Sequence, residues 1–473
     1  MKKRIVALLL ALVLALSLLP IPTLAAEAST PEAEFRYELA YDGSEFYAVI
    51  TGYTGTASEL TIPSEIGGHV VKSIGESAFQ SCKTLKSVKL PDRLTELGKF
   101  AFFNCTGLTS VTIPAGVTHI PLGAFDGCKN LTEVTLPDGL TGLDSYAFSG
   151  CQKLKQVTIP EGVKFIGHNT FYDCTALTEI TVPASVTLIG NDAFLDCSGL
   201  KAVTLQEGLT TIGYRAFMQC KALKSVKLPA SVTSIDNYAF MDCTGLSEIV
   251  FFGDAPDFGY DVFRFVTATV YYPGDNSTWT ESNLVDHGGK LTWVPYTPLP
   301  FADVSPEDFC YEPVAWAMEH EITTGTSGSA FSPDATCSRA QAVTFLWRAA
   351  GCPEPAVTEH PFVDVEKGSF YEKAVLWAVE TGITTGTDAT HFSPNSPCNR
   401  ATVVTLLYRA FEYPAFTPTG APFSDVPTGS WYTAPVLWAV EQGITNGIGD
   451  GTFGANTPCN RAQMVTFLYR AYN

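Results

Sequence analysis

Three arginines at a constant spacing of 61 residues are the side chains of this sequence best suited to hold an anion: Arg339, Arg400 and Arg461. Each follows a Ser or Asn and stands two residues before a Gln or Thr, which is close to the capping box that begins a helix. An Arg in a first helical turn would lie beside backbone N–H groups without an intrahelical partner, at the positive end of the helix dipole. Its guanidinium can also hold a carboxylate through two hydrogen bonds. The alternative is a salt bridge from each Arg to an Asp or Glu of a neighbouring unit.

Other residues share the 61-residue period and define the units that position these arginines. They are the acid of F-x-D-V, the Trp of a W-A pair and the Gly of I-T-x-G: Asp303, Asp364 and Asp425; Trp316, Trp377 and Trp438; Gly325, Gly386 and Gly447. Between these markers, Y-E-K-A-V-L-W-A-V-E-T-G-I and N-R-A-T-V-V-T-L-L-Y-R-A carry apolar residues at helical spacing. Each unit is therefore expected to be a helix, a loop and a helix, in which the tryptophans either form a sugar platform or fill the core.

Cysteine is the second residue type with chemical potential, and eight of the thirteen cysteines stand 23 residues apart: Cys82, Cys105, Cys128, Cys151, Cys174, Cys197, Cys220 and Cys243. A fixed period of this length indicates a solenoid. In stacked coils, equivalent side chains lie about 5 Å apart and point the same way, so they are poorly placed for disulfides. We interpret these thiols as small buried hydrophobic groups. Disulfides and a metal site remain the alternatives, although the sequence has no C-x-x-C pair.

The elements that position these eight ladder cysteines, one in each coil, follow from the sequence of one repeat. The alternation in L-K-S-V-K-L predicts a short strand with Leu85, Val88 and Leu90 inward, and Pro91 ends the pairing. Leu94 and Leu97 then point back inside, and an A-F pair begins a tight turn or short helix that ends at Cys. Because one coil cannot bury its own apolar face, the coils must stack, with the strands in a parallel sheet along one side.

The outward strand positions are small and polar. Five of them form a column of threonines, which we interpret as strand formers and not as a recognition stripe: Thr112, Thr135, Thr158, Thr181 and Thr204. Aromatic-rich segments on either side, 34–59 and 252–295, are expected to cap the solenoid, with glycan binding as the alternative role.

The 23-residue pattern, L-x-x-V-x-(I/L)-P-x-x-(V/L)-x-x-I-x-x-x-A-F-x-x-C, resembles the BspA-type leucine-rich repeats of bacterial surface proteins. The resemblance covers residues 60–261 and eight units in register. It implies a leucine-rich repeat solenoid that recognises proteins or glycans at cell surfaces, including in adhesion. The ligand of such a solenoid does not follow from the resemblance.

The 61-residue units resemble S-layer homology (SLH) domains over nearly all of residues 301–473. The resemblance implies one three-unit helical bundle that binds secondary cell-wall polysaccharide, often carrying pyruvate ketals, and so attaches an exported protein non-covalently. The T-R-A-E motif of that family corresponds to Ser338–Gln341, Asn399–Thr402 and Asn460–Gln463. The arginines, aspartates, tryptophans and glycines of the 61-residue period are then the expected polysaccharide-binding residues. Gln or Thr in place of the motif's Glu weakens the cap.

The amino-terminal segment predicts export. M-K-K-R precedes an apolar run of about 15 residues and a small-residue stretch, which is typical of a secretory signal peptide, here residues 1–26. A retained anchor is the alternative, but spanning needs about 20 apolar residues. The formal charge of −19 becomes −22 when Lys2, Lys3 and Arg4 leave with the signal peptide. Such an acidic chain argues against nucleic acid and anionic membranes as partners, and no membrane span is expected in the mature protein.

These observations predict an α/β solenoid followed by an all-α three-unit bundle. The expected boundaries are a cap at 34–59, repeats at 60–261, a second cap at 262–295, a linker at 296–300, and SLH units at 301–354, 362–414 and 423–473. We expect a bacterial cell-wall or S-layer location, a recognition or adhesion role, no cofactor and no metal. A structural envelope component is the alternative. A wall hydrolase is disfavoured, because H-E-x-x-H, G-x-S-x-G and a phosphate loop are all missing from the sequence.

Overall fold

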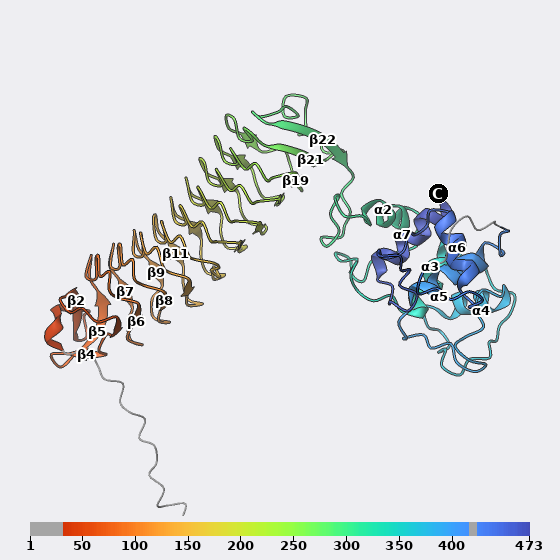
Figure 1. Ribbon diagram of the computed structural model, residues 1–473, viewed down its shortest axis with the longest axis horizontal. Coiled ribbons are helices and arrows are strands. Elements are labelled where there is room, and N and C mark those ends of the chain that lie inside the picture. The colour runs from red at the N-terminus through yellow and green to blue at the C-terminus, as the bar shows by residue number, and fades with distance from the viewer. Residues whose placement is uncertain (1–31, 416–422) are drawn as a thin grey trace, which may run out of the picture. The chain divides into compact units, whose positions relative to one another are not determined.

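The computed structural model describes residues 32–415 and 423–473, and the chain divides into two compact units, Met1–Thr297 and Pro298–Asn473. The predicted signal peptide lies outside the described residues. Within the described part, no helix is long and apolar enough to cross a membrane. Figure 1 shows the stacked coils of the first unit and the helices of the second.

The first unit begins with a small sheet that covers one end of the stack. A short 3₁₀ turn, η1 (Glu32–Glu34), leads into β1 (Phe35–Tyr41), which pairs antiparallel with β2 (Phe46–Tyr53). Strand β2 then pairs in parallel with β5 (His69–Ile74), and β4 (Glu65–Ile66) lies on the other side of β5. This sheet closes the open end of the apolar core, as a solenoid requires.

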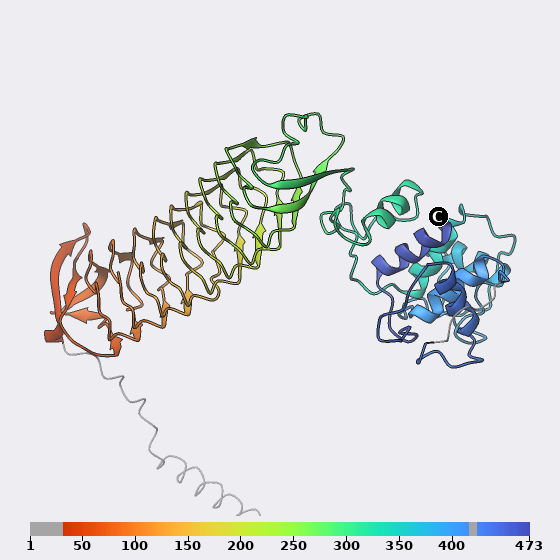
Figure 2. The same cartoon turned by 45° about the horizontal axis from the view of Figure 1, so that its top comes forward.

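The predicted strand is present in every coil except that of Cys151, where Gln156 forms only an isolated parallel bridge with Glu133. The strands of this first ladder fall into three parallel sheets. They are β3 (Glu59–Thr61), β6 (Ser87–Lys89), β8 (Ser110–Thr112) and β10 (Glu133–Thr135); β13 (Glu179–Val182) and β15 (Ala202–Leu205); and β17 (Ser225–Leu228), β19 (Glu248–Phe251), β21 (Thr267–Pro273) and β22 (Lys290–Tyr296). Partners such as Val134 and Val111 stand 23 residues apart, so the repeat period fixes the register. Figure 2 shows the coils stacked one behind another.

A second parallel ladder runs along the stack, which the sequence pattern did not predict. Its strands have two residues each: β9 (His119–Ile120), β11 (Gly142–Leu143), β12 (Phe165–Ile166), β14 (Leu188–Ile189), β16 (Thr211–Ile212), β18 (Ser234–Ile235) and β20 (Asp257–Phe258). The two-residue β7 (Glu96–Leu97) of the preceding coil pairs with β5 instead. The segment between Phe and Cys is a tight turn, with hydrogen bonds such as that from Cys82 N to Phe79 O at 3.2 Å, and not the short helix that was the other prediction.

The core between the ladders is a column of stacked phenylalanines, each fully buried: Phe79, Phe102, Phe125, Phe148, Phe171, Phe194, Phe217, Phe240 and Phe263. Successive ring centroids lie 5.0–5.7 Å apart with nearly parallel planes. Beside this column, seven of the eight ladder cysteines are buried as free thiols. Each buried thiol donates a hydrogen bond to the Phe carbonyl of the preceding coil, as from Cys105 Sγ to Phe79 O at 3.0 Å. The cysteines are thus buried, as expected, and also satisfy a backbone acceptor.

The second unit is a helical bundle of three helix pairs: α2 (Tyr311–Glu319) with α3 (Arg339–Ala349), α4 (Glu372–Glu380) with α5 (Arg400–Ala410), and α6 (Thr433–Glu441) with α7 (Arg461–Tyr472). The second helices of the pairs, α3, α5 and α7, contact one another at the centre. Each first helix packs on the central helix of the preceding pair, so that α4 lies on α3, α6 on α5, and α2 on α7. The bundle is therefore closed cyclically, and the predicted fold class, a leucine-rich solenoid followed by an all-α unit, is confirmed.

Candidate functional site

The three arginines of the 61-residue period stand where the central helices begin. The helices α3, α5 and α7 are capped by the side chains of Ser338, Asn399 and Asn460. In α3 and α7 the cap is reciprocal, because Gln at the third helical position also accepts from the backbone N–H of the capping residue. Thr402 occupies that position in α5, where only the forward bond forms. The predicted helix starts are present, and replacing the motif's Glu by Gln preserves the reciprocal cap.

Each of these arginines reaches into the next helix pair. The Nε atoms of Arg339, Arg400 and Arg461 donate to the carbonyls of Phe392, Phe453 and Phe331 at 2.8, 3.0 and 2.8 Å. Each guanidinium also lies over the ring of that same Phe, 4.7–4.9 Å from its centroid. The third contact returns from the last unit to the first, so the arginines close the ring of units. Neither the free anion site nor the salt bridge anticipated from the sequence describes this geometry.

Burial of the arginines contradicts the expectation of a free helix N-terminus. Arg400 and Arg461 are each 3% exposed, and desolvation lowers the pKa of both guanidinium groups. Arg339 is only half-buried. The first backbone N–H groups of each central helix are also occupied, since Arg400 N donates to Thr457 O and Ala401 N to Ala455 O. The loop of the neighbouring unit supplies these carbonyls, which the sequence of one unit cannot reveal.

The aspartates of F-x-D-V organise the loop that the arginines hold. The carboxylate of Asp364 accepts the backbone N–H groups of Phe392 and Ser393, both at 2.8 Å, and Asp303 and Asp425 do the same in their own units. Desolvation alone would raise the pKa of Asp364, but these backbone donors outweigh it and lower the pKa. The same Phe backbone is therefore bound twice. Its N–H donates to the Asp of its own unit, and its carbonyl accepts from the Arg of the preceding unit.

The glycines and tryptophans of the period have packing roles. Gly325, Gly386 and Gly447 adopt φ angles of +85° to +86°, and a Cβ there would collide with backbone carbonyls and with the Phe of F-x-D-V. Trp377 and Trp438 are 8% and 4% exposed, which places them in the core. Trp316 is half-buried against Tyr469 of the last unit. The twelve predicted site residues therefore lie in and around the seams between units.

Sequence reasoning missed a second set of three arginines at the same period. Arg348, Arg409 and Arg470 stand in the last turns of the central helices, and their Nη1 atoms donate to the carbonyls of Ile322, Ile383 and Ile444 at 3.0–3.1 Å. Those carbonyls belong to the I-T-x-G loop of the same unit. The W-R-A and Y-R-A sequences at 61-residue spacing were the available signal.

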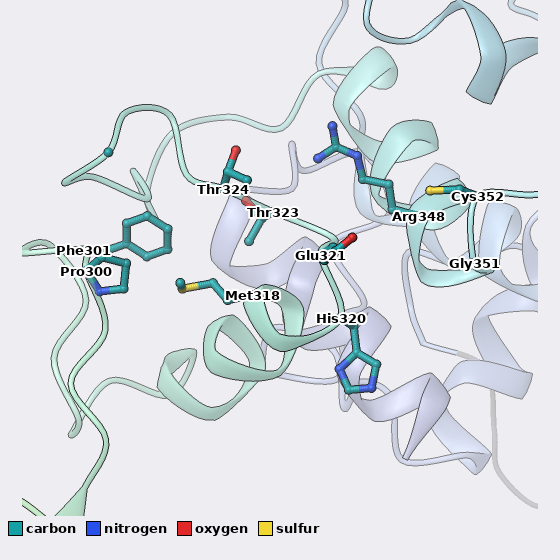
Figure 3. A pocket seen from close by; sticks show the side chains of 11 residues that line it. Pro300, Phe301, Met318, His320, Glu321, Thr323, Thr324, Arg348, Gly351 and Cys352 are labelled. Atoms are coloured by element: carbon teal, nitrogen blue, oxygen red, sulfur yellow. The ribbon is translucent and has the colours of Figure 1, made fainter. Parts of the chain in front are cut away.

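A depression of about 750 Å³ lies beside the first of these loops. Figure 3 shows Pro300, Phe301 and Met318 on one side of it and Arg348 and Cys352 on the other, with Thr323 and Thr324 between them. Arg348 uses one of its five N–H donors on Ile322 and retains others for a ligand. The carboxylate of Glu321 also lines the depression, so its surface combines an apolar wall with a cation, a carboxylate and hydroxyl groups. Such a mixture suits a sugar ring with hydroxyl groups and an acidic substituent.

Three further cysteines lie where the units meet at the centre of the bundle. The backbone N–H groups of Cys337, Cys398 and Cys459 donate to the carbonyls of Cys459, Cys337 and Cys398 at 2.8–2.9 Å, which forms a closed ring. Burial raises the pKa of the Cys398 and Cys459 thiols to about 12. No three His, Cys, Asp or Glu side chains among the described residues are arranged to hold a metal ion.

Comparison with known families agrees with both units. Residues 53–178 and 164–271 match the BspA type leucine rich repeat region, and residues 300–343, 361–404 and 422–465 match the S-layer homology domain. The chain thus carries a BspA-type leucine-rich repeat region followed by three SLH domains. SLH domains place it at a bacterial cell surface or S-layer, and they imply binding to cell-wall polysaccharide.

Several curated proteins share a short segment with this chain. An endoglucanase of Bacillus sp. (strain KSM-635) is 33% identical over 115 residues, covering 24% of this chain and 12% of the endoglucanase. A cell surface protein of Thermoanaerobacter kivui is 30% identical over 115 residues, covering 24% and 15%, and the S-layer protein sap of Bacillus anthracis is 31% identical over 125 residues, covering 26% and 15%. The chain therefore spans only 12–15% of the length of these curated relatives.

Solved leucine-rich repeat structures also align with this chain. A leucine rich cell surface protein of Faecalibacterium prausnitzii is 28% identical and covers 57% of this chain and 95% of its own, at a TM-score of 0.36. The leucine-rich repeat protein of T. pallidum is 29% identical and covers 50% and 88%, at a TM-score of 0.33.

Proposed function

We propose that this protein is a non-enzymatic recognition or adhesion protein, held on the cell wall by its SLH bundle while the solenoid displays a binding surface. The bundle binds an anionic secondary wall polysaccharide beside the I-T-x-G loops of its units, next to the seams that join them. The arginines, aspartates, tryptophans and glycines of the 61-residue period build these seams, and residues beside them contact the sugar.

The observation that best supports this proposal is the depression next to the first I-T-x-G loop. Phe301 and Met318 can pack against the apolar face of a sugar ring, and the guanidinium of Arg348 can pair with a carboxylate of the polymer. The same Asp, Gly and Arg geometry recurs in the other two units, so a polymer can meet equivalent groups repeatedly.

A structural envelope role is the second candidate, supported by surface-layer proteins among the relatives, such as the S-layer protein sap of Bacillus anthracis. In that role the solenoid would contact other copies of itself, and pure protein would form ordered two-dimensional arrays. Enzymatic activity is not proposed, although one relative is named an endoglucanase, because the match covers 12% of that protein.

Wall sedimentation tests the anchoring proposal. The mature chain should sediment with purified wall and lose this binding when the secondary polymer is chemically stripped. Thr324→Trp, which fills the depression from an exposed position, and Arg348→Lys, which keeps the charge but loses the planar fork, should each lower affinity about tenfold or more. Thr428→Trp, at an exposed turn of the third unit, is the matched control and should bind like the parent.

Helical circular dichroism accompanies each variant, so that lost binding is separated from lost structure. Wall binding that survives in folded Thr324→Trp and Arg348→Lys variants would reject the depression as a binding site. Equal binding to stripped wall would reject the polysaccharide as the anchor.

A further inference from the structure

One strip of positions along the solenoid of this acidic protein is rich in lysine. At the four positions after each ladder Cys, the eight coils hold eight lysines and no Asp or Glu: Lys83, Lys86, Lys129, Lys153, Lys155, Lys201, Lys221 and Lys224. All eight are exposed. We call these positions the lysine face. Since the whole chain has a formal charge of −19, the acidic groups must lie elsewhere, and net charge conceals this surface.

The lysine face is one continuous surface, because its residues are in register from coil to coil. Backbone hydrogen bonds join the fourth position of each coil to the next, as from Thr109 N to Lys86 O at 2.9 Å and from Thr132 N to Thr109 O at 2.8 Å. The same connection continues through Lys155, Thr178, Lys201 and Lys224 to Ser247. Threonine hydroxyls reinforce it, since Thr109 Oγ1 and Thr132 Oγ1 donate to the same carbonyls.

The lysines recur regularly along this face. Pairs stand in the first, fourth and seventh coils, as Lys83 with Lys86, Lys153 with Lys155, and Lys221 with Lys224. Each coil advances 5.0–5.7 Å between stacked ring centroids. Of the eight lysines, only Lys221 pairs with a carboxylate in the described part of the chain, that of Asp242 at 3.7 Å. The other charges are available to a ligand that extends along the stack.

A groove of about 720 Å³ opens on this face over the first coils. Its lining includes Lys83, Lys86 and Lys153 together with Thr109, Asn130 and Thr132, and it contains no carboxylate and no aromatic ring. Ammonium groups interspersed with hydroxyl and amide groups match a ligand that alternates negative charges with sugar hydroxyls. Single-stranded nucleic acid is a poorer match, because it requires aromatic side chains on which bases stack.

We propose that the lysine face binds an extended strand of an acidic polysaccharide, with Lys83, Lys86 and Lys153 as the principal contacts in the groove. The bundle already supplies the contact with the wall, so the ligand of the lysine face is a polysaccharide other than the wall polymer. Only this last step rests on the proposed function. The basic face and the groove are features of the solenoid itself.

Binding of the mature full-length chain to charged and neutral polymers tests this inference. Polygalacturonate, which carries a carboxylate on each sugar, should bind, and neutral dextran of similar length should not. Raising salt from about 50 mM to about 200 mM should weaken the polygalacturonate complex, because ion pairs with a polyanion release counterions. Equal affinity for dextran, or no binding to polygalacturonate at the lower salt, would overturn the proposal.

A triple variant locates the binding on the lysine face. Lys83→Gln, Lys86→Gln and Lys153→Gln together should weaken polygalacturonate binding about tenfold or more. The matched control, Lys99→Gln with Lys164→Gln and Lys290→Gln, removes the same charge from exposed positions elsewhere on the solenoid and should change affinity less than about twofold. Equal losses in the two variants would show that only net charge matters and would reject the site.

Two further measurements distinguish this proposal from unspecific polyanion binding and from binding of the wall polymer. Single-stranded DNA that binds the parent as tightly as polygalacturonate, with the same loss in the triple variant, would reject polysaccharide recognition in favour of unspecific polyanion binding. Wall sedimentation of the triple variant should equal that of the parent. If it falls instead, the lysine face binds the wall polymer, and a separate ligand is excluded while the bundle's own role remains testable through Thr324→Trp.

Discussion

At the scale of single residues, the buried arginines show how a cation is stabilised in this bundle without a carboxylate partner. The guanidinium of Arg400 lies between two rings, 4.9 Å from the centroid of Phe453 and 5.1 Å from that of Phe467. It also donates to Phe453 O and to Thr445 Oγ1 at 3.0 and 2.8 Å. Arg461 has the same two-ring arrangement, but its Nη2 has no hydrogen-bond partner among the described residues. Arg400 is therefore the better satisfied of the two.

Replacing Arg400 by Ala should destabilise the bundle by roughly 3 kcal/mol or more, because two charge-assisted hydrogen bonds and two ring contacts are lost in a buried site. Arg339→Ala should cost less, since Arg339 is half-buried and contacts one ring. Denaturant unfolding followed by helical circular dichroism measures both. Equal losses would mean that burial and the second ring contribute nothing.

The same residues mark what the sequence could and could not predict about the site. The Ser or Asn before each Arg located the helix starts, because capping is a local interaction. The partners of the Arg side chains lie 53 residues away, or 130 residues away for Arg461, and no local pattern reports them. The expectation of a solvent-facing Arg failed for this reason, and the binding role assigned to these residues stays a prediction.

At the scale of elements, one coil is a unit held by three kinds of contact with its neighbours. The two ladders supply backbone hydrogen bonds, the Phe column supplies apolar contact, and each buried Cys thiol donates to a carbonyl one coil away. Burial raises the pKa of the Cys128 thiol to about 12, so the neutral form that can donate persists at physiological pH.

Phe148→Ala in the middle of the stack should cost about 3–5 kcal/mol, because a fully buried ring is removed between two others. Phe79→Ala should cost less. Its outer neighbour is the half-buried ring of Tyr53 in the terminal sheet, whose centroid lies 5.7 Å away. Unfolding of the two variants under identical denaturant conditions provides the comparison, and a larger loss at Phe79 would contradict the stacked-column account.

Element by element, the sequence predicted the longer strand of the coils correctly, except at Gln156, but not the shorter one. Three or four residues of alternating polarity, repeated eight times, are a readable signal. Two residues such as Glu96 and Leu97 contain no alternation to detect, and their pairing becomes visible only when coils are stacked. The 23-residue period was the most informative feature of the sequence, because it predicts stacked coils without any assignment of strands.

At the scale of the whole molecule, the two units have separate cores. The buried cluster of the solenoid runs from Phe35 to Trp279 and includes no residue of the bundle. Calorimetry of the mature chain should therefore show two thermal transitions. Phe148→Ala should lower only one of them and Arg400→Ala only the other. A single transition that moves with either substitution would show that the units unfold as one.

Net charge is also a whole-molecule property, and here it proves a poor guide to local surfaces. The value of −19 argued from the sequence against nucleic acid and anionic membranes, yet the lysine face carries eight positive charges at three positions of the repeat. Periodicity makes this possible, since a residue type favoured at one repeat position is placed on one face as many times as the repeat occurs.

The invariant 23-residue step also has a consequence for heredity. Unequal crossing-over between similar repeats of a gene adds or removes whole coils, and a chain altered in this way keeps every ladder, every stacked Phe and every thiol contact in frame. Loss of residues 151–173, for example, would bring Cys174 one coil closer to Cys128 and delete Lys153 and Lys155 together. A single genetic step of this kind would change the length and the charge of the solenoid surface by one whole coil.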